Sequence, residues 1–245
     1  MRKSVICNVQ FVIVAVLSTA AFADTFTDAA KDYVYGDYQD SLAKSQNFIN
    51  SQEAKYLAGL NYLKLGEYSQ ARVAFQAAIS GNTKSIICDQ ARLKIADTYF
   101  LEKNYSLAKR EYLNLQQTPV ANNFLPLIYL RLAQIAAKEG NWGEKSAYLN
   151  KIKEQFPSSA EMKYVQILEA YGNFFTVQIG AFSSMDNAQA IIAELKGRYT
   201  AYIVKDVRPT LTVYRVRVGQ FAERPSAESA CEKLINEGFP AIVYP

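Results

Sequence analysis

The chain has 245 residues, of which 50% are hydrophobic, so it is long enough for one large domain or two small domains with separate cores. It contains no histidine, which excludes histidine-ligated zinc sites, Ser-His-Asp triads and Cys-His dyads. The 27 basic and 23 acidic residues give a formal net charge of +4 without any basic cluster, which argues against a polyanionic ligand such as nucleic acid.

Residues 1–23 have the pattern of a cleaved signal peptide. A basic start is followed by an apolar stretch over residues 11–17 and by Ala21-Phe22-Ala23, a small-x-small cleavage pattern. The alternative is an uncleaved membrane anchor, because an apolar run of about 20 residues can span a bilayer. Asn8 and Gln10 interrupt the run and favour cleavage. We therefore expect an exported chain with no stable membrane span after cleavage.

A helix–turn–helix pattern recurs through residues 24–172. The turn is written Gly36-Asp37-Tyr38, Gly66-Glu67-Tyr68, Lys103-Asn104-Tyr105 and Gly140-Asn141-Trp142. Small residues before each turn and large apolar residues after it predict antiparallel helix pairs, which bury a common core when they stack. Two positions depart from the pattern: Lys103 replaces the turn glycine, and Lys145 replaces the small residue seen at Ala71 and Ala108.

This pattern resembles the tetratricopeptide repeat, and the resemblance implies a protein partner bound by the helical repeats. Thirteen of the 17 tyrosines fall in this region. They either line a groove for a partner peptide or pack between helices, and the sequence does not choose the groove residues. A last helix is expected from Ser158, where Ser158-Ser159-Ala160-Glu161 forms a capping box, to about Tyr171.

The two cysteines that follow the signal peptide lie in different predicted domains. Cys88 belongs to the helical repeats, and Cys231 occupies a core position of a later helix. An exported protein can form a disulfide, but these positions favour two buried free thiols.

From residue 173 onward the hydrophobic periodicity changes from that of helices alone, and one supersecondary unit occurs twice in the sequence. The stretch V177-Q-I-G-A-F182 returns 39 residues later as V216-R-V-G-Q-F221. Alternation and helical periodicity predict strands at 175–179, 201–204, 213–218 and 241–244, with helices at 186–196 and 226–236. The order βαββαβ predicts a four-stranded sheet with both helices on one face. The chain is therefore expected to be α+β multidomain, with an all-α solenoid before this domain.

The strand phases divide the residues of the sheet between its two faces. Val177, Ile179, Val216 and Val218 are expected beneath the helices, which leaves Gln178, Arg215 and Arg217 on the opposite, uncovered face. The motifs F175-T-V-Q-I-G-A-F182 and Y214-R-V-R-V-G-Q-F221 are similar to the two halves of the SPOR (sporulation-related repeat) domain, over residues 173–245. That resemblance implies binding of bacterial peptidoglycan, especially of glycan strands without stem peptides, on the exposed sheet face.

Five residues are candidates for the glycan contact. Gln178 matches the glutamine of the SPOR motif, and its amide both donates and accepts hydrogen bonds. Arg215 and Arg217 either donate to sugar hydroxyls or form a solvated face paired with carboxylates. Tyr202 and Tyr244 can stack on sugars if their strand phases place them outward.

Together with the export signal, the two resemblances imply a non-enzymatic periplasmic adaptor. It would bind peptidoglycan through residues 173–245 and a protein partner through residues 24–172, at the division septum. The alternative is an accessory or regulatory subunit of a cell-wall hydrolase or synthase; RNA binding, which also uses βαβ topology, is disfavoured by export and by the near-neutral charge. No catalytic group, metal ligand set or cofactor motif stands out, so we expect no enzyme activity, no metal and no cofactor.

Overall fold

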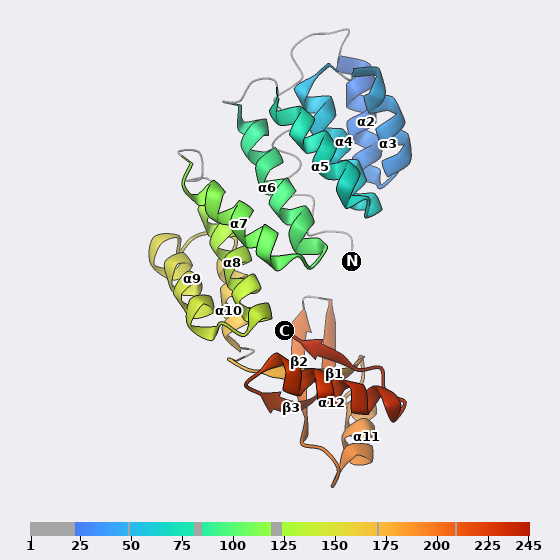
Figure 1. Cartoon of the computed structure of the whole chain (residues 1–245). Helices are drawn as coiled ribbons and strands as arrows, with labels where there is room; N and C mark the ends of the chain where they lie inside the picture. Colours follow the sequence, from blue (N-terminus) through green and yellow to red (C-terminus); the bar gives the residue numbers. More distant parts are fainter. Residues whose placement is uncertain (1–22, 49, 81–84, 119–123, 171, 209) are drawn as a thin grey trace. The chain divides into compact units, whose positions relative to one another are not determined.

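The computed structural model describes residues 23–245 except 49, 81–84, 119–123, 171 and 209 (Figure 1). The predicted signal peptide therefore lies almost wholly outside the described residues. The chain divides into two compact units, Met1–Ile128 and Tyr129–Pro245, and the division falls inside a helix. The predicted boundary between residues 172 and 173 stays a prediction.

The first unit is built from antiparallel helix pairs. Its elements are α2 (Ala23–Tyr35), α3 (Tyr38–Ser45), the short 3-10 helix η2 (Gln46–Phe48), α4 (Gln52–Leu65), α5 (Tyr68–Ile79), α6 (Ile86–Leu101) and α7 (Tyr105–Gln116). Helix α4 begins at the N-cap Ser51, whose side chain accepts from the amide of Ala54, and ends at Gly66 in the left-handed region. The predicted helical repeat is confirmed in this unit.

Each turn between paired helices uses a left-handed residue. Gly36, Gly66 and Gly140 have φ of 96°, 80° and 76°, and Lys103 takes the same conformation with φ of 61°. After Lys103, the amide of Asn104 donates to the carbonyl of Tyr99 at 2.9 Å, as the amide of Glu67 does to Tyr62 in the preceding repeat. The lysine therefore preserves the turn, although a side chain at positive φ carries a steric cost.

Small residues let paired helices approach closely in the core of the first unit. A Cβ atom on Gly59 of α4 would lie 2.5 Å from the ring of Phe75 on α5. Phe75 is fully buried and also contacts Tyr56, with ring centroids 5.6 Å apart. The alternation of small and large residues seen in the sequence thus corresponds to helix packing.

The second unit contains most of α8 (Leu125–Glu139), followed by α9 (Trp142–Gln155) and α10 (Met162–Ala170). Helix α10 begins at Met162, so the prediction of a helix from Ser158 is wrong. The amide of Ser159 donates to the carbonyl of Phe156 and that of Met162 donates to Ser159, so residues 157–161 form successive turns. These backbone hydrogen bonds close turns before Met162, so the helix does not begin at Ser158.

The remaining elements form the predicted βαββαβ domain. They are β1 (Phe175–Phe182), α11 (Met185–Leu195), β2 (Ala201–Arg208), β3 (Leu211–Phe221), α12 (Arg224–Asn236) and β4 (Ile242–Tyr244). The strand order is β2-β3-β1-β4, and every neighbouring pair is antiparallel. The predicted inward valines and Ile179 pack with Ala188, Leu195 and Leu234 of the two helices in one core. The predicted fold class is confirmed.

The duplicated motif has a packing explanation in its glycines. A Cβ atom on Gly180 would lie 2.5 Å from the ring of Phe182, and a Cβ atom on Gly219 would lie 2.5 Å from the ring of Phe221. Gly219 also has a φ of 69°, which favours glycine. In both copies the phenylalanine ring therefore folds back over the glycine two residues earlier, so the spacing is fixed by side-chain packing.

Cys88 and Cys231 are both buried free thiols, as predicted. Burial raises the pKa of the Cys231 thiol, which keeps the sulfur in its less reactive protonated form.

Candidate functional site

All five predicted glycan contacts lie on one face of the sheet. Arg217 on β3 pairs with Gln178 on β1 and with Tyr202 on β2. Arg215 lies two residues before Arg217 on β3, and Tyr244 pairs with Thr176, two residues before Gln178. Because residues two apart in a strand share a face, these side chains are opposite the valine face of the core.

One end of this face is closed by aromatic rings. The Arg217 guanidinium carbon lies 4.3 Å from the centroid of the Tyr244 ring, and Arg217 is only 2% exposed. The Tyr202 hydroxyl donates to Thr176 Oγ1 at 3.2 Å. Since β3 lies between β2 and β1, the Tyr202 side chain reaches across β3. The expectation of an uncovered Arg217 is therefore wrong, because strand phase gives the face of a residue and not what its neighbours cover.

The other end of the face presents a row of polar groups. Arg215 Nη2 donates to Asp206 Oδ2 at 3.0 Å, and Arg215 Nη1 donates to Gln178 Oε1 at 3.5 Å. The side chains of Arg215 and Asp206 are 20% and 23% exposed. Beside this row Ile242, the partner of Gln178 on β4, is 58% exposed. This end of the face is the part that a ligand can reach.

Sequence reasoning missed Asp206 and Ile242. Asp206 lies beyond the predicted end of the second strand, because β2 continues to Arg208. Its position opposite Val213 then places it on the same face as Arg215. A longer predicted β2–β3 hairpin would have included Asp206. Both strands, however, extend beyond the residues whose apolar alternation marks them as strand.

The turn between α8 and α9 contacts the sheet domain within the second unit. The Trp142 and Phe175 ring centroids are 5.1 Å apart. Arg224 Nε, at the start of α12, donates to the carbonyl of Lys138 at 3.1 Å. Lys138 Nζ lies 5.9 Å from the centroid of the Tyr244 ring. The end of α8 and the turn that follows it therefore contact the sheet domain, with Lys138 beside Tyr244 at the closed end of the polar face.

Lys145 explains the second departure from the repeat pattern. It is 3% exposed, and its Nζ donates to the carbonyls of Gly172 at 2.7 Å and Leu168 at 3.3 Å. Burial lowers the pKa of Lys145 because it penalises the ammonium charge, while Glu169 acts in the opposite direction. The lysine joins α9 to the end of α10 and to the segment that precedes β1.

Two hollows of the first unit occupy equivalent places in successive repeats. One, of about 670 Å³, lies among α3, α4 and α5, and the other, of about 600 Å³, lies among α5, α6 and α7. Residues that line them match at an offset of 37: Lys55 and Arg92, Ala58 and Ile95, Tyr62 and Tyr99. The two hollows are therefore the same feature of the repeat with different linings.

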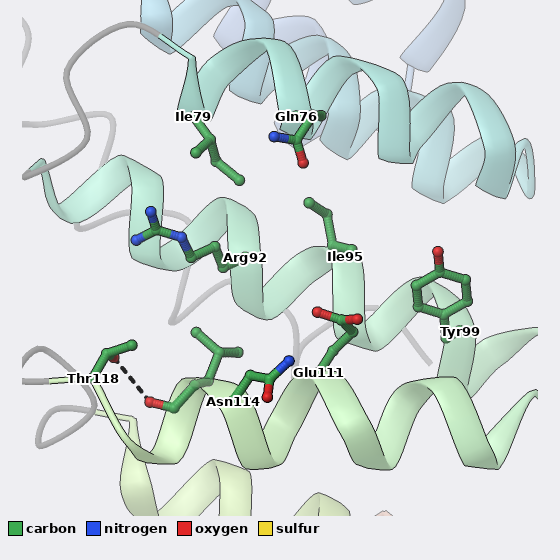
Figure 2. A pocket seen from close by; sticks show the side chains of 9 residues that line it. Gln76, Ile79, Arg92, Ile95, Tyr99, Glu111, Asn114 and Thr118 are labelled. Atoms are coloured by element: carbon green, nitrogen blue, oxygen red, sulfur yellow. Dashed lines mark hydrogen bonds between the residues drawn. The ribbon is translucent and has the colours of Figure 1, made fainter.

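The linings give the two hollows different chemistry. Figure 2 shows Arg92, Ile95 and Tyr99 projecting from α6 between α5 and α7, with Glu111 among the side chains on α7. The first hollow is lined mainly by apolar and small groups, among them Val73, which is 71% exposed. A partner segment that crossed both would meet an apolar surface and then a charged one.

Within the described part of the chain, no group of three or more Asp, Glu or Cys residues is placed to hold a metal ion. No described helix combines the length and apolar character needed to cross a bilayer.

The fold and these surfaces define a class of protein in which a helical-repeat region precedes a small α+β domain with an uncovered sheet face. Comparison with known families identifies both parts: residues 171–245 match the SPOR domain, and residues 53–81 match the tetratricopeptide repeat. The chain therefore carries a C-terminal SPOR domain preceded by a tetratricopeptide repeat. A SPOR domain implies peptidoglycan binding, and a tetratricopeptide repeat implies protein–protein interaction; both are binding domains.

Among solved structures, one from work described as "Functional Characterization of Pseudomonas Aeruginosa pilF" aligns with 17% identity and a TM-score of 0.43. The alignment covers 58% of this chain and 64% of that chain. No curated protein matches the sequence.

Proposed function

We propose that the protein is a non-enzymatic adaptor of the bacterial periplasm, which binds the glycan strands of peptidoglycan and a protein partner at the division septum. The observation that supports the glycan contact is the row Gln178–Arg215–Asp206 on the reachable end of the uncovered sheet face. Amide and guanidinium donors suit the many oxygen acceptors of a sugar chain. Of the residues nominated from sequence, Gln178 and Arg215 are the contacts we retain, and Arg217, Tyr202 and Tyr244 support them from the closed end.

The protein partner is proposed to bind in the two equivalent hollows of the repeats. The hollows line successive repeats from α3 to α7, which suits a segment that spans two repeats, with apolar side chains in the hollow beside Tyr62 and polar ones beside Arg92. Substitution of Val73 by Glu, which adds charge to the apolar hollow without disturbing the core, is expected to abolish partner capture. Co-purification of the same partner with this variant would exclude the hollow.

The experiment that tests the whole proposal is co-sedimentation of the exported chain with purified sacculi. We expect the protein to sediment with sacculi, more of it after an amidase has removed the stem peptides, and without release of soluble wall fragments. Release of fragments would show an enzyme. Fragment release only when a wall hydrolase or synthase is added would support an accessory subunit instead.

A further inference from the structure

The orientation of the Gln178 amide is determined by the chemistry of its neighbour. A guanidinium carries only hydrogen-bond donors, so the Gln178 atom that faces Arg215 has to be the carbonyl oxygen. The NH₂ group of the amide is then directed away from Arg215. Gln178 therefore offers its two N–H donors to a ligand, while its carbonyl oxygen already accepts one hydrogen bond from Arg215.

Arg215 can hold the amide in this orientation only if its own position is fixed. Asp206 accepts from Nη2 at 3.0 Å while Nη1 reaches Gln178, so one planar guanidinium connects β2 to β1 across β3. Both members of the ion pair are about four-fifths buried, which reduces the screening that weakens exposed pairs. Without Asp206, the Arg215 side chain regains its rotamers and the Gln178 amide can turn over.

The surroundings of the Gln178 NH₂ group suit an acetamido substituent. Such a group has a carbonyl oxygen that accepts a hydrogen bond and a methyl group that prefers an apolar neighbour. Ile242 pairs directly with Gln178 across β1 and β4 and is 58% exposed, so an exposed apolar residue is the strand neighbour of Gln178. A sugar hydroxyl would use the donor but would gain nothing from Ile242.

We propose that Asp206 is a positioning residue which, through Arg215, directs the Gln178 amide donors outward, and that Gln178 and Ile242 together recognise the N-acetyl groups of the glycan. This inference rests on the proposed function, because it specifies which part of the glycan the SPOR sheet face recognises. In this proposal Asp206 acts on the glycan through Arg215.

The positioning role is tested by calorimetry with the full exported chain and glycan strands stripped of stem peptides. Asp206→Asn is expected to weaken binding by roughly 2- to 13-fold, the equivalent of about one hydrogen bond, and Gln178→Ala by a similar factor. The double variant should bind no more weakly than the weaker single variant, because both changes remove the same contact. Multiplicative losses, or an Asp206→Asn variant that binds as wild type, would overturn the role of Asp206.

A matched control removes the same charge from the opposite side of the domain. Glu194 is exposed on α11, so Glu194→Gln is expected to leave both binding and the melting temperature unchanged. If Glu194→Gln weakens binding as much as Asp206→Asn, the effect is one of net charge and the positioning role is rejected. Failure of the wild-type chain to bind any glycan would instead reject the proposed function itself.

The acetamido specificity has its own experiment. Stripped glycan is chemically N-deacetylated, and a portion is then re-acetylated with acetic anhydride. The wild-type chain is expected to bind the deacetylated glycan at least several-fold more weakly and to recover on re-acetylation, whereas Ile242→Ser should lose most of this discrimination. Equal affinity of the wild type for all three glycans would overturn the assignment of the N-acetyl group.

Discussion

At the scale of single residues, Gln178 and Ile179 are neighbours on β1 with opposite surroundings. Gln178 lies partly exposed on the polar face, whereas Ile179 is 2% exposed in the core beneath the helices. Gln178→Ala is therefore expected to change the free energy of unfolding by no more than about 0.5 kcal/mol, and Ile179→Ala to lower it by about 2–5 kcal/mol. Chemical denaturation of both variants checks this. Unfolding of the domain by Gln178→Ala would show that the face is misassigned.

Lys103 offers a second test at this scale, because its φ of 61° is unfavourable for any residue with a Cβ atom. Lys103→Gly removes this strain, which for a non-glycine residue is roughly 1–2 kcal/mol, but glycine also gives the unfolded chain more freedom. We expect a net gain in stability of about 0.5–1 kcal/mol, measured as a higher melting temperature.

The control for Lys103 is Gly66, the equivalent residue of the preceding repeat. Gly66 has a φ of 80°, and a Cβ atom added there would meet no other atom within 4 Å, so Gly66→Ala adds backbone strain without a steric clash and only partly offsets it by restricting the unfolded chain. It should lower stability by about 1 kcal/mol. If Lys103→Gly and Gly66→Ala shift the melting temperature in the same direction, positive φ is not the controlling factor.

At the scale of elements, periodicity predicted the type of every helix and strand that it addressed but not where each ends. Strand alternation placed Val177 and Val216 in the core correctly, since face depends only on phase. It could not show that Tyr244 covers Arg217, because that contact joins β4 to β3 across β1 and depends on register. The start of α10 at Met162 was likewise decided by turn hydrogen bonds that the capping-box pattern does not reveal.

The stability of the end of α10 is predicted to depend on Lys145. Its ammonium supplies donors to the carbonyls of Leu168 and Gly172, and Lys145→Ala leaves both groups without this partner. We expect a loss of about 1–3 kcal/mol in the free energy of unfolding. Lys153→Ala on the same helix breaks an exposed ion pair with Glu169 and should cost no more than about 0.5 kcal/mol. A Lys145→Ala variant as stable as wild type would show that the desolvation cost of the buried charge cancels its hydrogen bonds.

At the scale of the whole molecule, the two compact units do not coincide with the two kinds of repeat in the sequence. The second unit joins the helices from Tyr129 onward to the SPOR domain. Both repeats could be predicted from the sequence, because similar residues recur in each at a constant spacing. Contacts between unlike elements leave no such periodic signal. Trp142 illustrates this: it occupies the position of the turn tyrosines Tyr68 and Tyr105, yet its ring contacts Phe175 of β1.

The contact between Trp142 and Phe175 predicts that the backbone amides of α9 and β1 are protected from hydrogen exchange together. Phe175 is 1% exposed, and besides Trp142 it has the guanidinium of Arg224 5.2 Å from its ring centroid. Trp142→Ala removes one side of this enclosure, and we expect it to lower stability by about 1–3 kcal/mol because the tryptophan is only partly buried. Hydrogen exchange on the full chain should then show faster exchange in α9 and in the first residues of β1 together. Trp142→Phe, which keeps an aromatic ring, should restore most of the protection in both elements. Faster exchange confined to α9, with β1 unchanged, would show that the last helical turn and the SPOR domain open independently.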